Sequence, residues 1–142
     1  MLTTYLLDTN MVSFILTGDS PAARQRMIRL AEDENEICCV STITEGELRF
    51  GLAKRPKAVA AEARSVLDNF LARVRVVPWG REEAESYGVM RAKLEAAGKL
   101  LSSMDMLIAA HAIALNAVMV SHDTAFARVE NLRALENWAT DL

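Results

Sequence analysis

The sequence predicts an α/β fold, a three-layer α/β/α sandwich of the doubly wound type around a central parallel sheet. Short apolar runs alternate along the chain with longer segments in which apolar residues recur at helical spacing. The runs, such as Thr4–Leu7 and Ala117–Ser121, are almost continuously apolar, which is typical of strands buried on both faces. Because strands and helices alternate, helices are expected on both faces of the sheet. The 142 residues contain no repeat or linker-like stretch, so we expect one domain over residues 1–142.

Five strands are expected, and capping residues indicate where the intervening helices begin and end. Ser20-Pro21 is an N-cap and first-turn pair, Gly98 is a glycine at a helix C-terminus, and Ser102 or Ser103 caps a strongly apolar helix. The expected strands are Thr4–Leu7, Glu36–Val40, Val74–Pro78, Ala117–Ser121 and a segment near Arg133–Leu135. The expected helices are Met11–Leu16, Pro21–Ala31, Thr42–Ala53, Pro56–Arg73, Arg81–Ala97, Met104–Leu115 and a turn at Thr124–Val129.

Composition and charge limit the classes of function. No apolar run approaches the ~20 residues that span a bilayer, and the N-terminal segment lacks the basic start of a signal peptide. The adjacent Cys38 and Cys39 should point to opposite faces of a strand, which suits two buried thiols in a reducing cytoplasm. The net charge of −3 argues against broad coating of nucleic acid. It leaves room for a local site, because 12 of the 16 basic residues are Arg, which binds phosphate in a bidentate manner.

Two carboxylates lie at positions where a parallel sheet binds ligands, beyond the carboxyl ends of its strands, and a third lies at the start of a helix. Asp8 directly follows the first expected strand, and Asp123 follows the fourth by one residue after Ser121. Asp105 stands in the first turn of the apolar helix, where the helix dipole favours a negative charge. Taken singly, Asp105 is better explained as a helix cap than as a functional residue.

A fourth carboxylate comes from the helix Thr42–Ala53, which holds both Glu45 and Glu47. Glu45 stands four residues before Arg49, the favourable order for a surface ion pair. Glu47 shares its side of the helix with Ile43 and Phe50, which we expect to turn inward. An inward carboxylate needs a partner, so Glu47 is the better functional candidate.

Four converging carboxylates would repel one another unless a cation lay between them. Oxygen ligands without clustered Cys or His favour a hard ion, so Mg²⁺ or Mn²⁺ is expected. A cation held in this way can orient a water and balance the charge of an in-line displacement at phosphorus. Hydrolysis of a phosphodiester is therefore the predicted chemistry.

Several segments together resemble the motifs of PIN-domain nucleases, and specifically the VapC toxins of bacterial type II toxin–antitoxin systems. The resemblance runs from about residue 4 to 138. It is carried by Tyr5-Leu6-Leu7-Asp8-Thr9-Asn10, Ser41-Thr42-Ile43-Thr44-Glu45-Gly46-Glu47-Leu48 with Gly51, Arg91-Ala92-Lys93-Leu94-Glu95, Asp105-Met106-Leu107-Ile108-Ala109-Ala110-His111-Ala112, Val120-Ser121-His122-Asp123 with Phe126, and Glu136-Asn137-Trp138 with Leu132.

The resemblance implies a Mg²⁺- or Mn²⁺-dependent endoribonuclease that acts on structured RNA and is neutralised by a VapB-type antitoxin. It implies that Asp8, Glu47, Asp105 and Asp123 form the catalytic, metal-binding quartet. Asn10 and Ser121 would support these carboxylates, and Arg91 would contact either a substrate phosphate or a surface carboxylate. A homodimer, or a larger toxin–antitoxin assembly, is also expected.

Three other functions share parts of this pattern. An aspartate-based phosphatase usually has a second acid two residues after the first, where Asn10 stands. A phospho-acceptor receiver domain would need a late Lys, and none follows Lys99. A PIN-fold binding module without activity is disfavoured because all four acids are present. His111 is expected to be a hydrogen-bonded structural residue, His122 to lie outside the catalytic set, and Trp79 and Trp138 to serve packing or interfaces.

Overall fold

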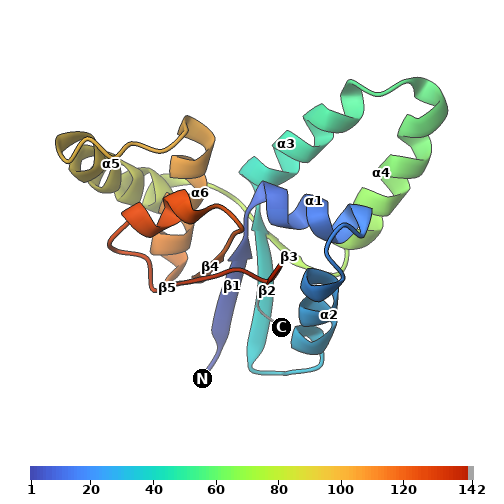
Figure 1. The fold of residues 1–142 in the computed structure, drawn as a ribbon, viewed down its shortest axis with the longest axis horizontal. Coiled ribbons are helices and arrows are strands. Elements are labelled where there is room, and N and C mark those ends of the chain that lie inside the picture. Colours follow the sequence, from blue (N-terminus) through green and yellow to red (C-terminus); the bar gives the residue numbers. More distant parts are fainter. Residues whose placement is uncertain (141–142) are drawn as a thin grey trace.

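The computed structural model describes residues 1–140, and residues 141 and 142 of the expected domain lie outside this part. Its centre is a five-stranded parallel sheet with the strand order β3-β2-β1-β4-β5 (Figure 1). The strands are β1 (Thr3–Leu7), β2 (Glu36–Ser41), β3 (Arg75–Val77), β4 (Val118–Val120) and β5 (Ala134–Glu136). The predicted parallel sheet is confirmed, with each strand within two residues of its expected start and end.

Within residues 1–140, six α-helices and one 3₁₀ helix surround the sheet. They are α1 (Thr9–Thr17), α2 (Pro21–Ala31), α3 (Thr42–Ala53), α4 (Lys57–Leu71), α5 (Arg81–Ala96), α6 (Ser103–Leu115) and η1 (Thr124–Arg128). The helix α1 begins two residues earlier than predicted because the Asp8 side chain caps it. Gly98 (φ 68°) adopts the left-handed conformation predicted for a glycine after a helix, and Asn116 (φ 51°) adopts the same conformation after α6.

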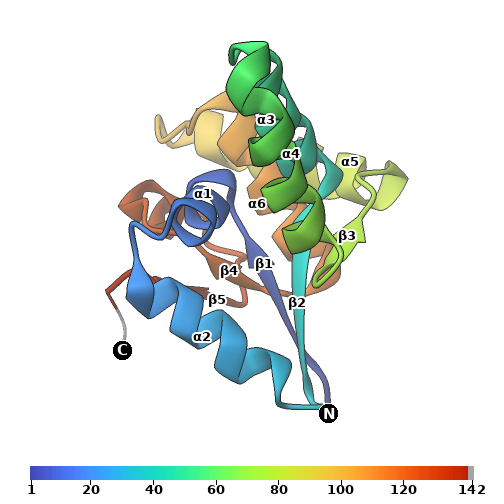
Figure 2. The same ribbon diagram turned by 90° about the vertical axis from the view of Figure 1, so that its right-hand side faces the viewer.

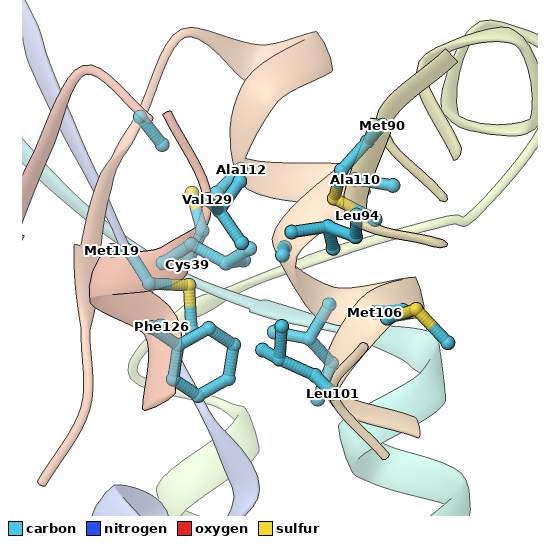
Figure 3. Packing of buried hydrophobic residues seen from close by; sticks show 14 residues of the cluster. Cys39, Met90, Leu94, Leu101, Met106, Ala110, Ala112, Met119, Phe126 and Val129 are labelled. Atoms are coloured by element: carbon cyan, nitrogen blue, oxygen red, sulfur yellow. The ribbon is translucent and has the colours of Figure 1, made fainter. Parts of the chain in front are cut away.

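The two faces of the sheet are buried in separate cores, because successive side chains of a strand point in opposite directions. Leu6 and Met119 face a cluster formed with α5, α6 and η1, part of which Figure 3 shows. Leu7 and Val120 face a second cluster formed mainly with α1 and α2. The three-layer sandwich is therefore confirmed.

The adjacent cysteines follow the same alternation. Cys39 is buried in the core on the α5–α6 side, whereas Cys38 is only partly buried and packs against the other core. Both thiols are free. The prediction of opposite faces is confirmed, and the prediction that both thiols are buried is wrong for Cys38. Within residues 1–140, no helix is long and apolar enough to cross a membrane.

Two helix pairs flank the end of the sheet at which β1 and β2 terminate. Figure 1 shows the α3–α4 hairpin rising on one side of these strand ends and α5 with α6 on the other. Figure 2 shows α3 and α4 side by side, standing away from α2 at the opposite end of the molecule. The carboxyl ends of the strands thus lie between the two pairs, where the sequence predicted a site.

Candidate active site

Asp8 lies at the carboxyl end of β1 and is almost completely buried, with 3% of its surface exposed. It is the N-cap of α1, and its Oδ1 accepts the Met11 N–H at 2.8 Å. The Ser121 hydroxyl donates to its other oxygen, Oδ2, at 2.6 Å. The chain thus fixes this carboxylate from both sides, because a buried polar group needs such partners.

The surroundings of Asp8 raise the pKa of its carboxyl group above the ordinary value. Burial is the largest cause, since it disfavours the charged form. The hydrogen bonds from Ser121 and Met11 oppose this effect, whereas the nearby charges of Asp105 and Asp123 add to it. Asp105 and Asp123 are therefore close enough to Asp8 to disfavour its charged form.

Asp123 reaches the site from the loop after β4. It caps η1 and accepts the Ala125 N–H at 2.8 Å, and its carboxylate is exposed. Its backbone N–H donates to the Ser121 Oγ at 2.9 Å. One serine hydroxyl thus links the buried Asp8 to the backbone that carries Asp123.

Asp105 lies in the first turn of α6 and is half-buried. The cap of this helix is Ser102, whose Oγ accepts the Asp105 N–H at 3.2 Å. A capping role was the alternative explanation for the presence of Asp105 at this helix start. Ser102, not Asp105, is the cap. The Asp105 carboxylate is instead among the charges that raise the pKa of Asp8.

Glu47 comes from α3, and the Thr9 hydroxyl donates to its Oε1 at 2.7 Å. Thr9 directly follows Asp8, so it ties the fourth carboxylate to the end of β1. Glu45 pairs instead with Arg49, whose Nη2 lies 2.8 Å from its Oε2, as predicted. One premise was wrong: Phe50 is 64% exposed rather than inward-facing, because α3 projects from the sheet and only its Thr44 is buried.

The sequence alone does not indicate that Thr9 belongs to the site. Its signal is its position between an acid that ends a strand and the first turn of the next helix. A hydroxyl there can reach a neighbouring helix, but nothing local indicates that α3 supplies the acceptor.

The donors in this site suit a hard divalent cation in chemistry, because all four are carboxylates. Within residues 1–140, no three carboxylate, thiol or imidazole side chains are grouped tightly enough to enclose a metal ion.

Comparison with known proteins identifies the family. The PIN domain family matches residues 5–132. The chain belongs to the PIN domain family. The ribonuclease VapC2 of Rickettsia felis is 34% identical over 135 residues, which cover 94% of this chain and 97% of that protein. The tRNA(fMet)-specific endonuclease VapC of Shigella flexneri is 29% identical over 136 residues, or 95% and 98% of the two chains.

Solved structures of relatives agree with this PIN domain in fold. The crystal structure of VapBC2 from Rickettsia felis bound to a promoter DNA fragment matches it with a TM-score of 0.88 at 33% identity, covering 96% of this chain and 99% of that one. DNA-bound VapBC from Salmonella typhimurium matches with a TM-score of 0.86 at 27% identity, covering 97% and 99%. The predicted resemblance to VapC ribonucleases is thereby confirmed.

The remaining predicted site residues of this PIN domain differ in their hydrogen bonds. Ser121 makes the contacts that a supporting residue would make. Asn10 is exposed on α1, and within residues 1–140 no hydrogen bond joins it to the four carboxylates. Arg91 is exposed on α5, where its Nη1 donates to the Tyr87 hydroxyl at 2.7 Å rather than to a carboxylate.

The predicted roles of the two histidines and two tryptophans are confirmed for some of these residues and wrong for another. His111 is fully buried, yet neither ring nitrogen has a hydrogen-bond partner within the described residues, so the prediction of a hydrogen-bonded histidine is wrong. His122 is exposed, packs edge-on against Phe14 and exchanges a hydrogen bond with Asn137. Trp138 is buried in the core, and the Trp79 indole donates to the Leu107 carbonyl at 2.9 Å. Packing roles are confirmed for both tryptophans.

Proposed function

We propose that this PIN domain is the endoribonuclease of a toxin–antitoxin pair and that it cleaves structured RNA in the cytoplasm to inhibit translation. The relatives named as VapC ribonucleases support the class of reaction. The observation that carries the proposal is the carboxylate arrangement: Asp8 is fixed at the end of β1, and two further acids act on its charge. Like charges beside a buried carboxylate are costly unless a cation balances them.

Asp8, Glu47, Asp105 and Asp123 would hold Mg²⁺ or Mn²⁺. The ion would supply charge balance at the phosphate and a water of lowered pKa as nucleophile. The protein contributes alignment: the Ser121 and Met11 donors keep the Asp8 oxygens in place, and Thr9 orients Glu47. Asn10 and Arg91 remain as proposed contacts to the site and to a substrate phosphate.

The substrate class follows from the named relatives. One of them is a tRNA(fMet)-specific endonuclease. We infer that this chain also acts on a tRNA or an exposed ribosomal RNA loop. Direct hydrolysis would leave a 5′-phosphate and a 3′-hydroxyl, because attack by the neighbouring 2′-hydroxyl is not needed.

A VapB-type antitoxin is the proposed partner, since the similar solved structures are VapBC complexes. A groove of about 500 Å³ between α1, α3 and α4 is a suitable seat, because Glu47 lies at its wall beside apolar Leu48 and Val59. A helical antitoxin segment could cover the apolar part while a basic side chain met the carboxylates. The homodimer, or a larger assembly with the antitoxin, belongs to the same proposal.

Substitution of the acids tests the nuclease assignment. Purified wild-type protein should cleave tRNA with Mg²⁺ or Mn²⁺, and Asp105→Asn and Glu47→Gln should each lower the rate at least 100-fold without unfolding the protein. Glu45→Gln is the matched control on the same helix and should keep near wild-type activity. Normal cleavage by Asp105→Asn would contradict the quartet, and equal loss in the Glu45 and Glu47 variants would remove the distinction between them.

A further inference from the structure

A second pocket of about 390 Å³ lies outside the carboxylate site, between the end of α5 and the segment that follows η1. Its apolar wall includes Met90, Leu94 and Val129, each of which is at most 5% exposed. Figure 3 shows these three side chains in the core cluster on the α5–α6 side. The pocket is therefore a recess on a rigid core.

The rim of this pocket is basic in a protein whose net charge is −3. Lys93, Lys99 and Arg128 line it, together with one carboxylate, that of Glu130. Within residues 1–140, no ion pair joins any of these three cations to an acid. The Arg128 Nη1 donates to the Leu100 carbonyl at 3.1 Å, which holds the guanidinium against the chain while its other N–H groups stay available.

The pocket is connected to the carboxylates by two short segments of the chain. Arg128 is the last residue of η1, and Asp123 caps the first turn of the same helix. Lys99 stands three residues before Ser102, the cap of the helix that carries Asp105.

We propose that this pocket binds a nucleotide of the RNA substrate, away from the scissile phosphate. Each lysine would contact a different backbone phosphate, and the apolar wall would take the face of a base or ribose. An RNA strand fits this combination because each nucleotide carries an anionic and an apolar part. The inference rests on the proposed ribonuclease function and adds a subsite for substrate binding.

Two matched pairs of lysines make the test possible, because the chain has four lysines and only two of them line this pocket. The variant Lys93→Gln/Lys99→Gln removes two charges from the pocket, and Lys54→Gln/Lys57→Gln removes two from the α3–α4 hairpin. All four side chains are exposed, so both proteins should fold, and circular dichroism should verify it.

Binding of fluorescent tRNA is first measured in proteins that also carry Asp8→Asn, so that the RNA stays intact. The pocket pair should lower affinity about tenfold and reduce the salt dependence of log K by about two, one for each lost phosphate contact. The hairpin pair should change both values much less. Equal losses in the two pairs would overturn the proposal.

Kinetic measurements on proteins that keep Asp8 distinguish an effect on RNA binding from an effect on catalysis. With intact Asp8, the pocket pair should raise KM for tRNA and keep kcat. Hydrolysis of bis(p-nitrophenyl) phosphate with Mn²⁺ should stay unchanged, because this diester is too small to reach the pocket. A lower kcat on both substrates would contradict a binding role. If wild-type protein cleaves neither substrate, the ribonuclease function fails, and the tRNA-binding measurement still decides whether the pocket binds RNA.

Discussion

Ser121 joins two of the four carboxylate residues through a single hydroxyl group. The hydroxyl donates to the Asp8 Oδ2 and accepts the Asp123 N–H. It is buried, so water cannot replace it without a rearrangement. A residue between strand and loop thus controls how the site's two strand-end acids lie relative to each other.

Ser121→Ala should lower the free energy of unfolding by about 1–3 kcal/mol, because a buried carboxylate and a backbone N–H lose a partner. It should also lower RNA cleavage by about 10–100-fold, since residues that orient metal-binding carboxylates have effects of this size. Urea unfolding and tRNA cleavage measure the two changes. Ser121→Thr keeps the hydroxyl and is the control. A folded Ser121→Ala protein with normal cleavage would exclude the supporting role.

His111 is the least satisfied polar residue of the core. It lies in α6, and burial lowers the pKa of its imidazole, while the nearby charge of Glu83 opposes the shift. The unfolded chain therefore binds a proton at a higher pH than the folded one. Stability should be lost as the pH falls below the unfolded value of about 6.5.

Substitution of His111 by Leu tests this dependence. The wild-type free energy of unfolding should fall between pH 7.5 and pH 5.5, and His111→Leu should show a smaller fall, because the titrating group is gone. At pH 5.5 the variant should be at least as stable as the wild type, since it also removes an unsatisfied buried group. Urea unfolding at both pH values measures it. An identical pH dependence in the two proteins would show that His111 is not responsible.

At the scale of an element, α6 positions Asp105 through its first turn. Ser102 caps the helix and binds the backbone N–H of Asp105. The rest of the helix is packed into the core, with Ile108, Ala109 and Ala110 buried. The cap therefore holds the exposed end of an otherwise rigid helix, and that end carries the carboxylate.

Ser102→Ala should cost about 1 kcal/mol of stability, as is usual for the loss of a serine N-cap. Because the first turn would fray, cleavage of tRNA should fall more than stability alone explains. Ser103→Ala changes the adjacent exposed serine, which is not the cap, and should have little effect on either quantity. Equal effects of the two changes, measured by urea unfolding and cleavage rates, would contradict this role of the cap.

The elements themselves could be predicted to a large extent because their signals are local. Ser20-Pro21, Gly98 and Asn116 mark helix ends by their own conformational preferences. Which side of α3 is buried could not be predicted from local signals of this kind. Its apolar Phe50 suggested an inward side, but the hairpin projects beyond the sheet, and this arrangement depends on tertiary packing.

At the scale of the whole molecule, sheet order decides which acids meet. β1 lies between β2 and β4, so Asp8 after β1 and Asp123 after β4 come from neighbouring strands. Strand-end positions were readable from the sequence for these two acids. The Thr9–Glu47 contact and the position of Asp105 near Asp8 could not be predicted from the sequence. Both depend on how α3 and α6 approach the sheet.

Cation binding should stabilise the whole molecule through the carboxylates. At a Mn²⁺ concentration 100 times the dissociation constant, the gain should be about 2.7 kcal/mol, or ~5–10 °C in Tm. Asp8→Asn should lose most of this gain. Without metal it should unfold no more easily than the wild type, because the change removes a buried charge that Asp105 and Asp123 repel. Thermal unfolding with Mn²⁺ or with EDTA measures both, and equal Mn²⁺ stabilisation of both proteins would place the cation elsewhere.

The most direct test of the central claim is the cleavage of tRNA by purified wild-type protein, with the new ends identified. The carboxylate site predicts cleavage with Mg²⁺ or Mn²⁺, none with EDTA, and fragments whose new 5′ ends carry a phosphate. Cleavage that persists in EDTA, or fragments that end in a 2′,3′-cyclic phosphate, would contradict a metal-dependent hydrolytic site at Asp8, Glu47, Asp105 and Asp123.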